Sequence, residues 1–310
     1  MHPKHVLVAG ATGFIGQVLV RRLLASGHRV SALYRSRKPE GLEEAAWIST
    51  GDLAATSLDP ALGTGVDTVV ALAARVRPAA APVTSGPSET ERIARNLRDF
   101  VIAAGIRRVL VGSSIAARIA ETEPRNARGY GREKSAADRI FLSLPRENHE
   151  VVLLRPPAVY GPGMRNSMGM LARLVDKGIP LPLGSATAPR HYISLHNLVT
   201  LMEAMVAADD AAWTSAAGRA YEPSDGTPVS TRDLVRMMGG VTGRKARLVP
   251  FPLSWLRLAG AAAGRPELVS GAVDRLKAAD DGSLERHFGW RPAERMPESL
   301  AFLAAEVRRV

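Results

Sequence analysis

Three glycines at three-residue spacing follow an apolar run near the start of the chain. Gly10, Gly13 and Gly16 belong to GATGFIG, which separates the run HVLVAG (5–10) from an amphipathic segment. Glycines in this context let a strand turn tightly into a helix, and they let the backbone approach a phosphate at the positive helix end. The sequence therefore predicts a dinucleotide-binding turn. Thr12, Phe14 and Ile15 are predicted to contact the cofactor there, although packing under the helix would also explain Phe14 and Ile15.

Apolar runs and amphipathic segments alternate through the first half of the chain. After HVLVAG the apolar runs are RVSALY (29–34), DTVVAL (67–72), RRVLVG (107–112) and EVVLLR (150–155). Runs this continuously apolar are typical of parallel strands buried on both faces. Helices are expected between them, one of them beginning at a capping box of Ser88 and Glu91. The predicted fold class is α/β: a Rossmann-type, doubly wound parallel sheet.

The composition and patterning of the sequence change after Arg155. PPAVYGPG and IPLPLGSATAPR are rich in turn residues, and most of the remaining chain has a helical pattern. We expect a dinucleotide-binding domain over residues 1–160 and a smaller, mostly helical substrate lobe over 161–310. The segment 190–206 is expected to return to the first domain, so that domain is expected to consist of two separate stretches of the chain.

Composition narrows the functional classes. The 310 residues include no cysteine, carry a net charge of +11 and are only 5% aromatic. The basic residues are scattered and form no block, which argues against nucleic-acid binding and favours an anionic small-molecule substrate. We expect no metal site, no signal peptide and no membrane association, and we expect a cytoplasmic protein whose redox chemistry depends on a cofactor.

The end of the second apolar run carries basic side chains where a fold that prefers NAD usually has an acidic one. The residues are Arg35, Ser36, Arg37 and Lys38, directly after Tyr34. Guanidinium groups bind phosphate through paired charge-assisted hydrogen bonds, which suits the 2′-phosphate of NADP(H). The sequence predicts NADP(H) as the preferred cofactor, with NAD(H) and ordinary surface arginines left open. Asp52 is a candidate acceptor for the adenine amine.

Tyr130 and Lys134 lie four positions apart in GYGREKSAADR, where a helix is expected. Side chains at this spacing share a helix face, so the ammonium can lie beside the phenol and lower its pKa. A phenol with a lowered pKa can exchange a proton with an alcohol or ketone. Ser113 and Ser114 follow the run 107–112, at the sheet edge where ligands bind in open α/β folds. Tyr130, Lys134 and Ser114 are the predicted catalytic residues.

These motifs together resemble the extended short-chain dehydrogenase/reductase superfamily, in its NAD-dependent epimerase/dehydratase branch. The resemblance rests on GATGFIG, GDL, ALAARV, GSSIA, YGREK, LRPPAVYGPG, LPLGSATAPRHYIS and FGWRP, in that order. It is strongest for bacterial UDP-hexose 4-epimerases, 4-dehydrogenases and 4-keto reductases. It implies an acid/base role for Tyr130, with Lys134 as ribose ligand and Ser114 as hydroxyl donor, and it implies a homodimer. The further cofactor contacts that it implies are Leu53, Leu72, Ala73, Ala74 and Pro157, and the substrate contacts are Ser113, Asn166, Ser167 and Arg190, the last of these on a diphosphate.

Several positions depart from the family pattern. Ala71 and Thr90 replace an expected histidine and asparagine, Arg118 and Ile119 replace a tyrosine and glycine, and Lys277 with Ala278 lie where an arginine is usual. The first hypothesis is redox or epimerase chemistry at C4 of a UDP-sugar. The second keeps the chemistry and changes the substrate to a sterol-like or other apolar carbonyl compound. A third, of another class, is a dinucleotide-binding sensor or assembly subunit without turnover.

Overall fold

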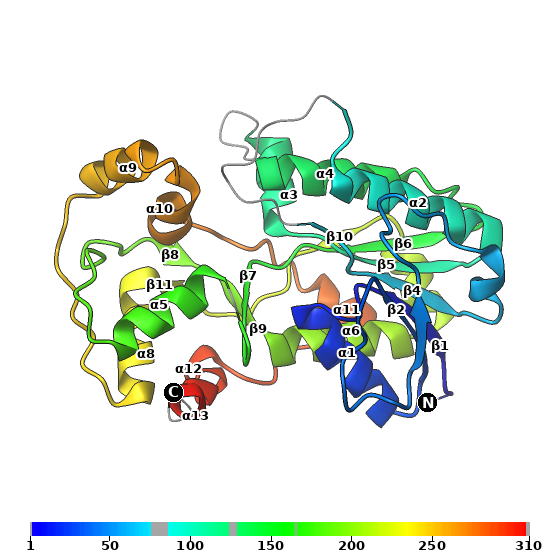
Figure 1. Ribbon diagram of the computed structural model, residues 1–310, viewed down its shortest axis with the longest axis horizontal. Coiled ribbons are helices and arrows are strands. Elements are labelled where there is room, and N and C mark those ends of the chain that lie inside the picture. Colours follow the sequence, from blue (N-terminus) through cyan, green and yellow to red (C-terminus); the bar gives the residue numbers. More distant parts are fainter. Residues whose placement is uncertain (1, 76–85, 124–128, 165, 308–310) are drawn as a thin grey trace.

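The computed structural model describes residues 2–75, 86–123, 129–164 and 166–307 as two lobes side by side (Figure 1). The larger lobe is built on a seven-stranded sheet in the order β10-β6-β5-β4-β1-β2-β3, in which every strand pair is parallel. The strands are β1 (His5–Ala9), β2 (Arg29–Tyr34), β3 (Ala46–Ser49), β4 (Thr68–Ala71), β5 (Arg108–Gly112), β6 (Glu150–Leu154) and β10 (Ala220–Tyr221). The predicted Rossmann-type fold is confirmed.

Helices cover both faces of this sheet, so successive strand residues enter two different cores. Val6 and Val8 pack with α1 (Phe14–Ala25) and α6 (Leu195–Ala207) on one face. Leu7 and Ala9 pack with α2 (Glu89–Ala104) and α4 (Gly129–Leu142) on the other. Figure 1 shows α2 and α4 above the strands and α1 and α6 below them. Burial on both faces explains why the strand sequences do not alternate with polar residues.

The helix ends follow the expected local chemistry. Ser88 accepts a hydrogen bond from the backbone N–H of Glu91, whose side chain accepts one from the Ser88 N–H, so the predicted capping box begins α2. The helix ends at Gly105, whose φ of 64° is in the left-handed region that glycine adopts without strain. This helix therefore begins where the sequence predicts, and a glycine ends it.

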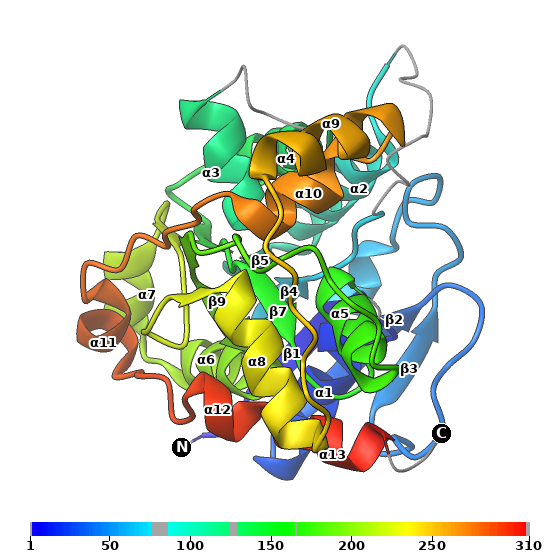
Figure 2. The ribbon, with the colours of Figure 1, turned by 90° about the vertical axis from the view of Figure 1, so that its left-hand side faces the viewer.

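The smaller lobe has its own hydrophobic core, which includes Met164, Val175, Leu234, Met238 and Leu300. Two short sheets line it: β7 (Ala158–Tyr160) pairs parallel with β9 (Tyr192–Ser194), and β8 (Pro189–Arg190) pairs antiparallel with β11 (Val229–Ser230). Its helices are α5 (Ser167–Asp176), α8 (Thr231–Thr242), α9 (Leu253–Ala262), α10 (Pro266–Val273), α12 (Met296–Ser299) and α13 (Phe302–Val307). Figure 2 views the molecule from this lobe, with α8 and α5 in front of the sheet.

Several elements after residue 160 belong to the larger lobe. They are α6, α7 (Asp210–Ala216), β10 and α11 (Ser283–Phe288), while α3 (Ile115–Thr122) and the 3-10 helix η1 (Pro60–Gly63) come from the first half. Asn197 on α6 is fully buried, and its Nδ2 donates to Asp225 Oδ1 (2.7 Å) and to the Glu294 carbonyl (2.8 Å). This amide ties α6 to two segments that lie far away in the sequence. The division near residue 160 stays a prediction.

No helix in the described part of the chain combines the length and apolar character needed to cross a bilayer.

Candidate active site

The glycine loop has no room for larger residues. Gly10 has a φ of +90°, and a Cβ there would lie 2.7 Å from the Ala73 backbone nitrogen. A Cβ on Gly16 would collide with the Gly10 carbonyl oxygen. The chain after β4 therefore runs directly beside the loop, where Leu72 donates its N–H to the Ala9 carbonyl (2.8 Å). Leu72 and Ala73 therefore lie next to Gly10, and the contacts of Leu72, Ala73 and Ala74 with the cofactor stay predictions.

The first turn of α1 is open to an anion. Gly13 occupies the N-cap position, no side chain caps the helix, and no acidic residue lies in its first turn. Backbone N–H groups at a helix N-terminus attract negative charge, and the macrodipole adds to this attraction. The loop and helix end therefore fit the pyrophosphate of a dinucleotide.

The end of β2 presents cationic side chains to solvent. Arg35, Ser36 and Arg37 are exposed, and Arg37 makes only a loose ion pair with Glu40 (3.3 Å), both side chains being more than 80% exposed. Tyr34 precedes them and packs edge-on against Trp47. No acidic residue occurs between positions 34 and 39, so no carboxylate ends this strand.

Asp52, the predicted acceptor for the adenine amine, lies three residues after the end of β3. Its Oδ1 accepts a hydrogen bond from the Ala54 N–H (3.0 Å), and its Oδ2 lies 3.5 Å from an Arg75 nitrogen. The Leu53 side chain packs in the core under α2, and its carbonyl accepts from Asn96 (2.8 Å). A cofactor contact at residue 53 is therefore limited to the main chain, while Asp52 stays the predicted polar contact.

Tyr130 and Lys134 lie one turn apart on α4, close to the carboxyl end of β5. Lys134 is 8% exposed, and its Nζ donates to the Gly112 carbonyl at 2.8 Å. Tyr130 is 38% exposed, and its phenol lies close enough to the Ser114 side chain for Ser114 to lower its pKa. Ser114 also caps α3, where its Oγ accepts from the Ala116 N–H (3.2 Å). The three predicted catalytic residues therefore meet at one sheet edge, with Ser114 beside the phenol.

The pKa of Tyr130 differs in direction from the expectation. Burial of the hydroxyl raises it, the bond with Ser114 lowers it by less, and the negative charges of Asp138 and Glu133 raise it further. Burial lowers the pKa of Lys134 to about 8, which leaves the amine mostly protonated at neutral pH. The ammonium is directed at the Gly112 carbonyl and does not offset the burial of the phenol. In this state of the protein Tyr130 is a neutral phenol, the form that donates a proton to a ketone oxygen.

A buried polar network beneath the catalytic residues was not predicted from the sequence. Ser113 donates to Asp138 Oδ2 (2.8 Å), so its hydroxyl is turned to the interior, and direct substrate contact by Ser113 stays a prediction. Arg155 donates from Nε to the same oxygen (2.9 Å) and from its two terminal nitrogens to Glu121 (2.7 and 2.8 Å). Burial raises the pKa of Asp138, whereas Ser113 and Arg155 lower it. The sequence did contain a signal for Asp138, because it lies one further helical turn beyond Lys134 and so on the same helix face.

The predicted substrate residues of the smaller lobe have different surroundings. Arg190 is 7% exposed and donates to the Asp274 carbonyl, and its Nε is buried without a hydrogen-bond partner in the described structure. Asn166 caps α5: its Oδ1 accepts from two backbone N–H groups, and its Nδ2 donates to the Val159 carbonyl (2.7 Å). Ser167 is exposed, and Pro157 is buried just after β6. Of these residues, Arg190 has the clearest unused donor.

The positions that depart from the family pattern have structural partners. Thr90 is buried and donates from Oγ1 to the Arg75 carbonyl (3.1 Å). Arg118 donates to Glu222 (2.6 Å) and to the Lys277 carbonyl (2.8 Å), linking α3 to a segment near the end of the chain. These two side chains therefore anchor segments of chain at positions where the family pattern has other polar groups.

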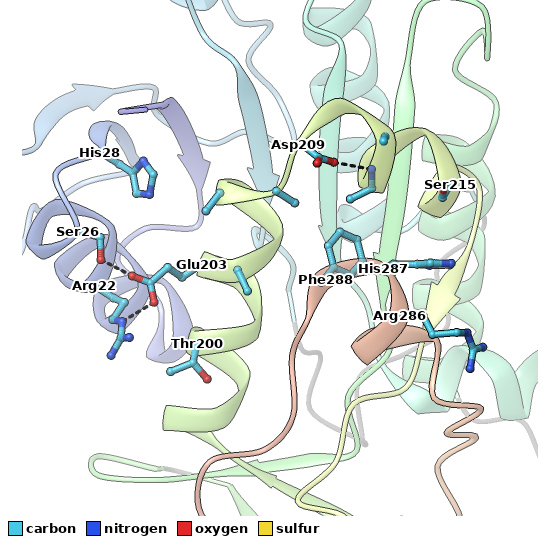
Figure 3. A pocket seen from close by; sticks show the side chains of 15 residues that line it. Arg22, Ser26, His28, Thr200, Glu203, Asp209, Ser215, Arg286, His287 and Phe288 are labelled. Carbon is cyan, nitrogen blue, oxygen red and sulfur yellow. Dashed lines mark hydrogen bonds and ion pairs between the residues drawn. The ribbon is translucent and has the colours of Figure 1, made fainter. Parts of the chain in front are cut away.

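A cavity of about 960 Å³ lies elsewhere, between α1, α6, α7 and α11 (Figure 3). Glu203 on its wall pairs with Arg22 (2.6 Å) and with Ser26, and Asp209 accepts from the Ala212 N–H as the cap of α7 (2.8 Å). None of the predicted site residues lines it. Because these carboxylates are satisfied within the protein, we do not place the catalytic chemistry in this cavity.

Known proteins match this chain over nearly its whole length. The model of the NAD dependent epimerase/dehydratase family matches residues 6–218. UDP-glucose 4-epimerase of Vibrio cholerae is 32% identical over 99% of this chain and 98% of its own. 2-Alkyl-3-oxoalkanoate reductase of Stenotrophomonas maltophilia (strain K279a) is 28% identical over 97% and 98%. Among solved structures, MoeE5 in complex with UDP-glucuronic acid and NAD has a TM-score of 0.76 and 27% identity, covering 98% of this chain and 99% of that one.

Proposed function

Because the chain belongs to the NAD dependent epimerase/dehydratase family, we propose that it oxidises or reduces a secondary alcohol or ketone at C4 of a nucleotide sugar. The observation that carries the proposal is the meeting of Tyr130, Ser114 and Lys134 at the carboxyl edge of the sheet, where the glycine loop also opens. Ligands bind at this edge in doubly wound folds.

Each catalytic residue has a separate task in this proposal. Tyr130 donates its proton to a substrate ketone oxygen, or takes the proton of a substrate hydroxyl in the reverse direction. Ser114, which lies beside that phenol, orients the same substrate oxygen. Lys134 is held by the Gly112 carbonyl and presents the remaining donors of its ammonium to a ribose. The dinucleotide, when bound, supplies or accepts the hydride.

Arg190 supports a nucleotide diphosphate as the anionic part of the substrate. A buried guanidinium with an unused Nε–H costs free energy unless a ligand accepts from it. Diphosphate oxygens match this donor in charge and geometry. Relatives named for UDP-sugars fit the same chemistry, since UDP-glucose 4-epimerase matches the whole chain and MoeE5 was solved with UDP-glucuronic acid.

We expect UDP and UDP-sugars to raise the melting temperature of the protein in the presence of NAD(P)H. Arg190→Met is expected to remove this shift while the shift with dinucleotide alone remains, because the latter depends on the glycine loop. Arg232→Met is the matched control, since Arg232 lies in the same lobe and its Nε pairs with Asp233 (3.4 Å). A dinucleotide response without any UDP response would contradict the nucleotide-sugar proposal.

The second candidate is an apolar carbonyl substrate, and the departures at positions 71 and 90 favour it. Ala71 is buried and has no polar side-chain atom. The Thr90 hydroxyl donates a hydrogen bond to the Arg75 carbonyl. A relative named 2-alkyl-3-oxoalkanoate reductase also matches the whole chain. In this candidate the tasks of Tyr130, Lys134 and Ser114 are unchanged.

For the cofactor, we propose a preference for NADP(H), supported by the exposed Arg35 and Arg37 and by the absence of a carboxylate at the end of β2. MoeE5 was solved with NAD, so the proposed preference rests on the residues of this chain and not on that relative. We expect NADPH to bind about tenfold tighter than NADH, because tenfold in Kd corresponds to the free energy of one charge-assisted hydrogen bond. Arg35→Ala with Arg37→Ala is expected to remove the difference, while Arg29→Ala, at the opposite end of β2, preserves it. Tighter binding of NADH in a titration would contradict the preference.

A further inference from the structure

Arg118 lies at the centre of a set of polar contacts between the catalytic edge of the sheet and the chain that leads out of the smaller lobe. On α3, its Nε donates to Glu222 Oε1 (2.6 Å), and a terminal nitrogen donates to the Lys277 carbonyl (2.8 Å). The Glu222 side chain is 5% exposed, and its other oxygen accepts from the Ala279 N–H (2.8 Å). These contacts clamp residues 274–279, which we call the connecting segment, to α3.

The connecting segment also runs beside Arg190. The Arg190 side chain donates to the Asp274 carbonyl. The Leu276 carbonyl accepts from the His191 N–H (2.9 Å), and His191 Nδ1 accepts from the Ala278 N–H (2.8 Å). Figure 1 shows the chain between α10 and α11 crossing from the smaller lobe to the larger one. The connecting segment therefore joins the proposed diphosphate-binding arginine to the clamp on α3.

The direction of the Ser114 hydroxyl depends on where α3 lies. Ser114 is the N-cap of this helix, and its Oγ accepts from the Ala116 N–H (3.2 Å). With eight residues, α3 is too short to be stable without contacts to the rest of the protein. Its start lies against α4, because a Cβ on Gly131 would be 2.5 Å from the Ala116 carbonyl oxygen. Since Gly131 is next to Tyr130, a shift of α3 would move Ser114 relative to the phenol.

Two ion pairs fasten α3 to the ends of two neighbouring strands. Glu121 pairs with Arg155, directly after β6, at 2.7 Å. Arg118 pairs with Glu222, directly after β10, and β10 is the neighbour of β6 in the sheet. The second pair also holds the connecting segment. Loss of Arg118 is therefore expected to free that segment from α3 while the first pair still holds the helix on the sheet.

We propose that Arg118 is a positioning residue that fixes Ser114 at a set distance from the proposed diphosphate site at Arg190. A nucleotide sugar would be held at both places, by its diphosphate and by the oxygen that reacts beside Tyr130. The spacing between them then decides which substrate oxygen meets the phenol, and a misplacement of about 1 Å can cost about 10²-fold in rate. This inference rests on the proposed function, because it requires a substrate that is bound at both ends.

The experiment compares kcat and KM of Arg118→Met with those of the wild type, with a nucleotide sugar as substrate. We expect kcat to fall by about 10- to 100-fold. The Kd values of NAD(P)H and of UDP alone are expected to stay near those of the wild type, because neither ligand spans both sites. Arg118→Lys is expected to recover part of the loss, since it keeps a cation beside Glu222 but lacks the rigid fork of donors.

Arg22→Met is the matched control. Arg22 pairs with Glu203 at the same distance, 2.6 Å, beside the cavity of Figure 3. The substitution therefore breaks a similar ion pair away from the predicted catalytic residues, and we expect kcat to stay near the wild-type value.

A double-mutant cycle tests whether Arg118 acts through Ser114. We expect Ser114→Ala to lower kcat, and we expect Arg118→Met to have little further effect in that background, because the hydroxyl that it positions is absent. Two losses of kcat that multiply in the double variant would show that Arg118 acts independently of Ser114, which would overturn the proposal.

The fold of each variant is checked by circular dichroism, because Arg118→Met leaves the buried Glu222 carboxylate without its ion pair. If that variant does not fold, Arg118→Met with Glu222→Gln removes the buried charge and is expected to show the same fall in kcat. An unchanged kcat in either folded variant overturns this inference and leaves the proposed function intact. A wild type that turns over no nucleotide sugar overturns both.

Discussion

Tyr130→Phe is expected to lower turnover by about 10³-fold or more while dinucleotide binding is retained. The substitution removes only the hydroxyl, which is the proton donor in the proposed chemistry, and general acid–base groups typically contribute 10²–10⁴-fold. The phenylalanine ring keeps the packing of the tyrosine on α4. The measurement is the change in NAD(P)H absorbance with the nucleotide sugar that raises the melting temperature most, together with the dinucleotide Kd of the variant.

Tyr221→Phe is the matched control for this result. The Tyr221 hydroxyl bonds to His287 Nδ1 (2.5 Å), and its ring packs against Phe288 on the α1/α6 face of the sheet, opposite α4. We expect its turnover to stay near the wild-type value. Unchanged turnover in Tyr130→Phe would remove this residue from the mechanism. A chain that binds dinucleotide but turns over no substrate, with or without the hydroxyl, would instead fit a sensor or assembly subunit.

Arg155→Met is expected to lower the free energy of unfolding by about 3–5 kcal/mol, the usual cost of breaking a buried ion pair. Asp138 is 1% exposed, and the variant leaves its carboxylate with Ser113 as its remaining hydrogen-bond donor among the described residues. Urea unfolding followed by circular dichroism measures the loss. Arg107→Met is the control, because the Arg107 side chain is 53% exposed and the buried Glu150 keeps Arg108 and Thr214 as partners, so the loss is expected to be less than about 1 kcal/mol.

The loss in Arg155→Met is expected to grow with pH. Burial already raises the pKa of Asp138 in the native protein, and Arg155 lowers it. Without Arg155 the native carboxyl holds its proton to higher pH than the unfolded one, so its contribution to stability falls as pH rises above the unfolded pKa of about 4. The deficit relative to wild type should therefore be smaller at pH 4 than at pH 7. Adding Asp138→Asn should recover part of it, and a deficit independent of pH would contradict this account.

Local sequence patterns predicted the larger lobe well because its elements depend on neighbours in the chain. The strands from β1 to β6 that were expected lie within one residue of their predicted ranges, and the capping box of α2 is present. Tyr130 and Lys134 share a helix face because helical spacing requires it. The family resemblance extended this prediction to the whole chain, and the comparisons confirm the family.

Features that depend on distant contacts were not predictable in this way. Strand β10 is two residues long and carries no periodic signal. The Asp138–Arg155 pair joins a helix to the end of a strand, and the raised pKa of Tyr130 follows from burial that the sequence does not reveal. The homodimer, the cytoplasmic location and the individual cofactor contacts stay predictions.

Because the chain returns to the first sheet, the smaller lobe of this enzyme is not one continuous segment that can be exchanged between proteins. Residues 192–222 provide β9, which pairs with β7, then α6 beneath the sheet, and finally the edge strand β10. Replacing everything after residue 160 would remove α6, which packs against α1, and β10, which pairs with β6. Strand β6 would then be an unpaired edge strand. A chimera that replaces the smaller lobe would therefore have to exchange residues 161–191, 223–282 and 291–307 together, and keep both the middle segment and α11 in place.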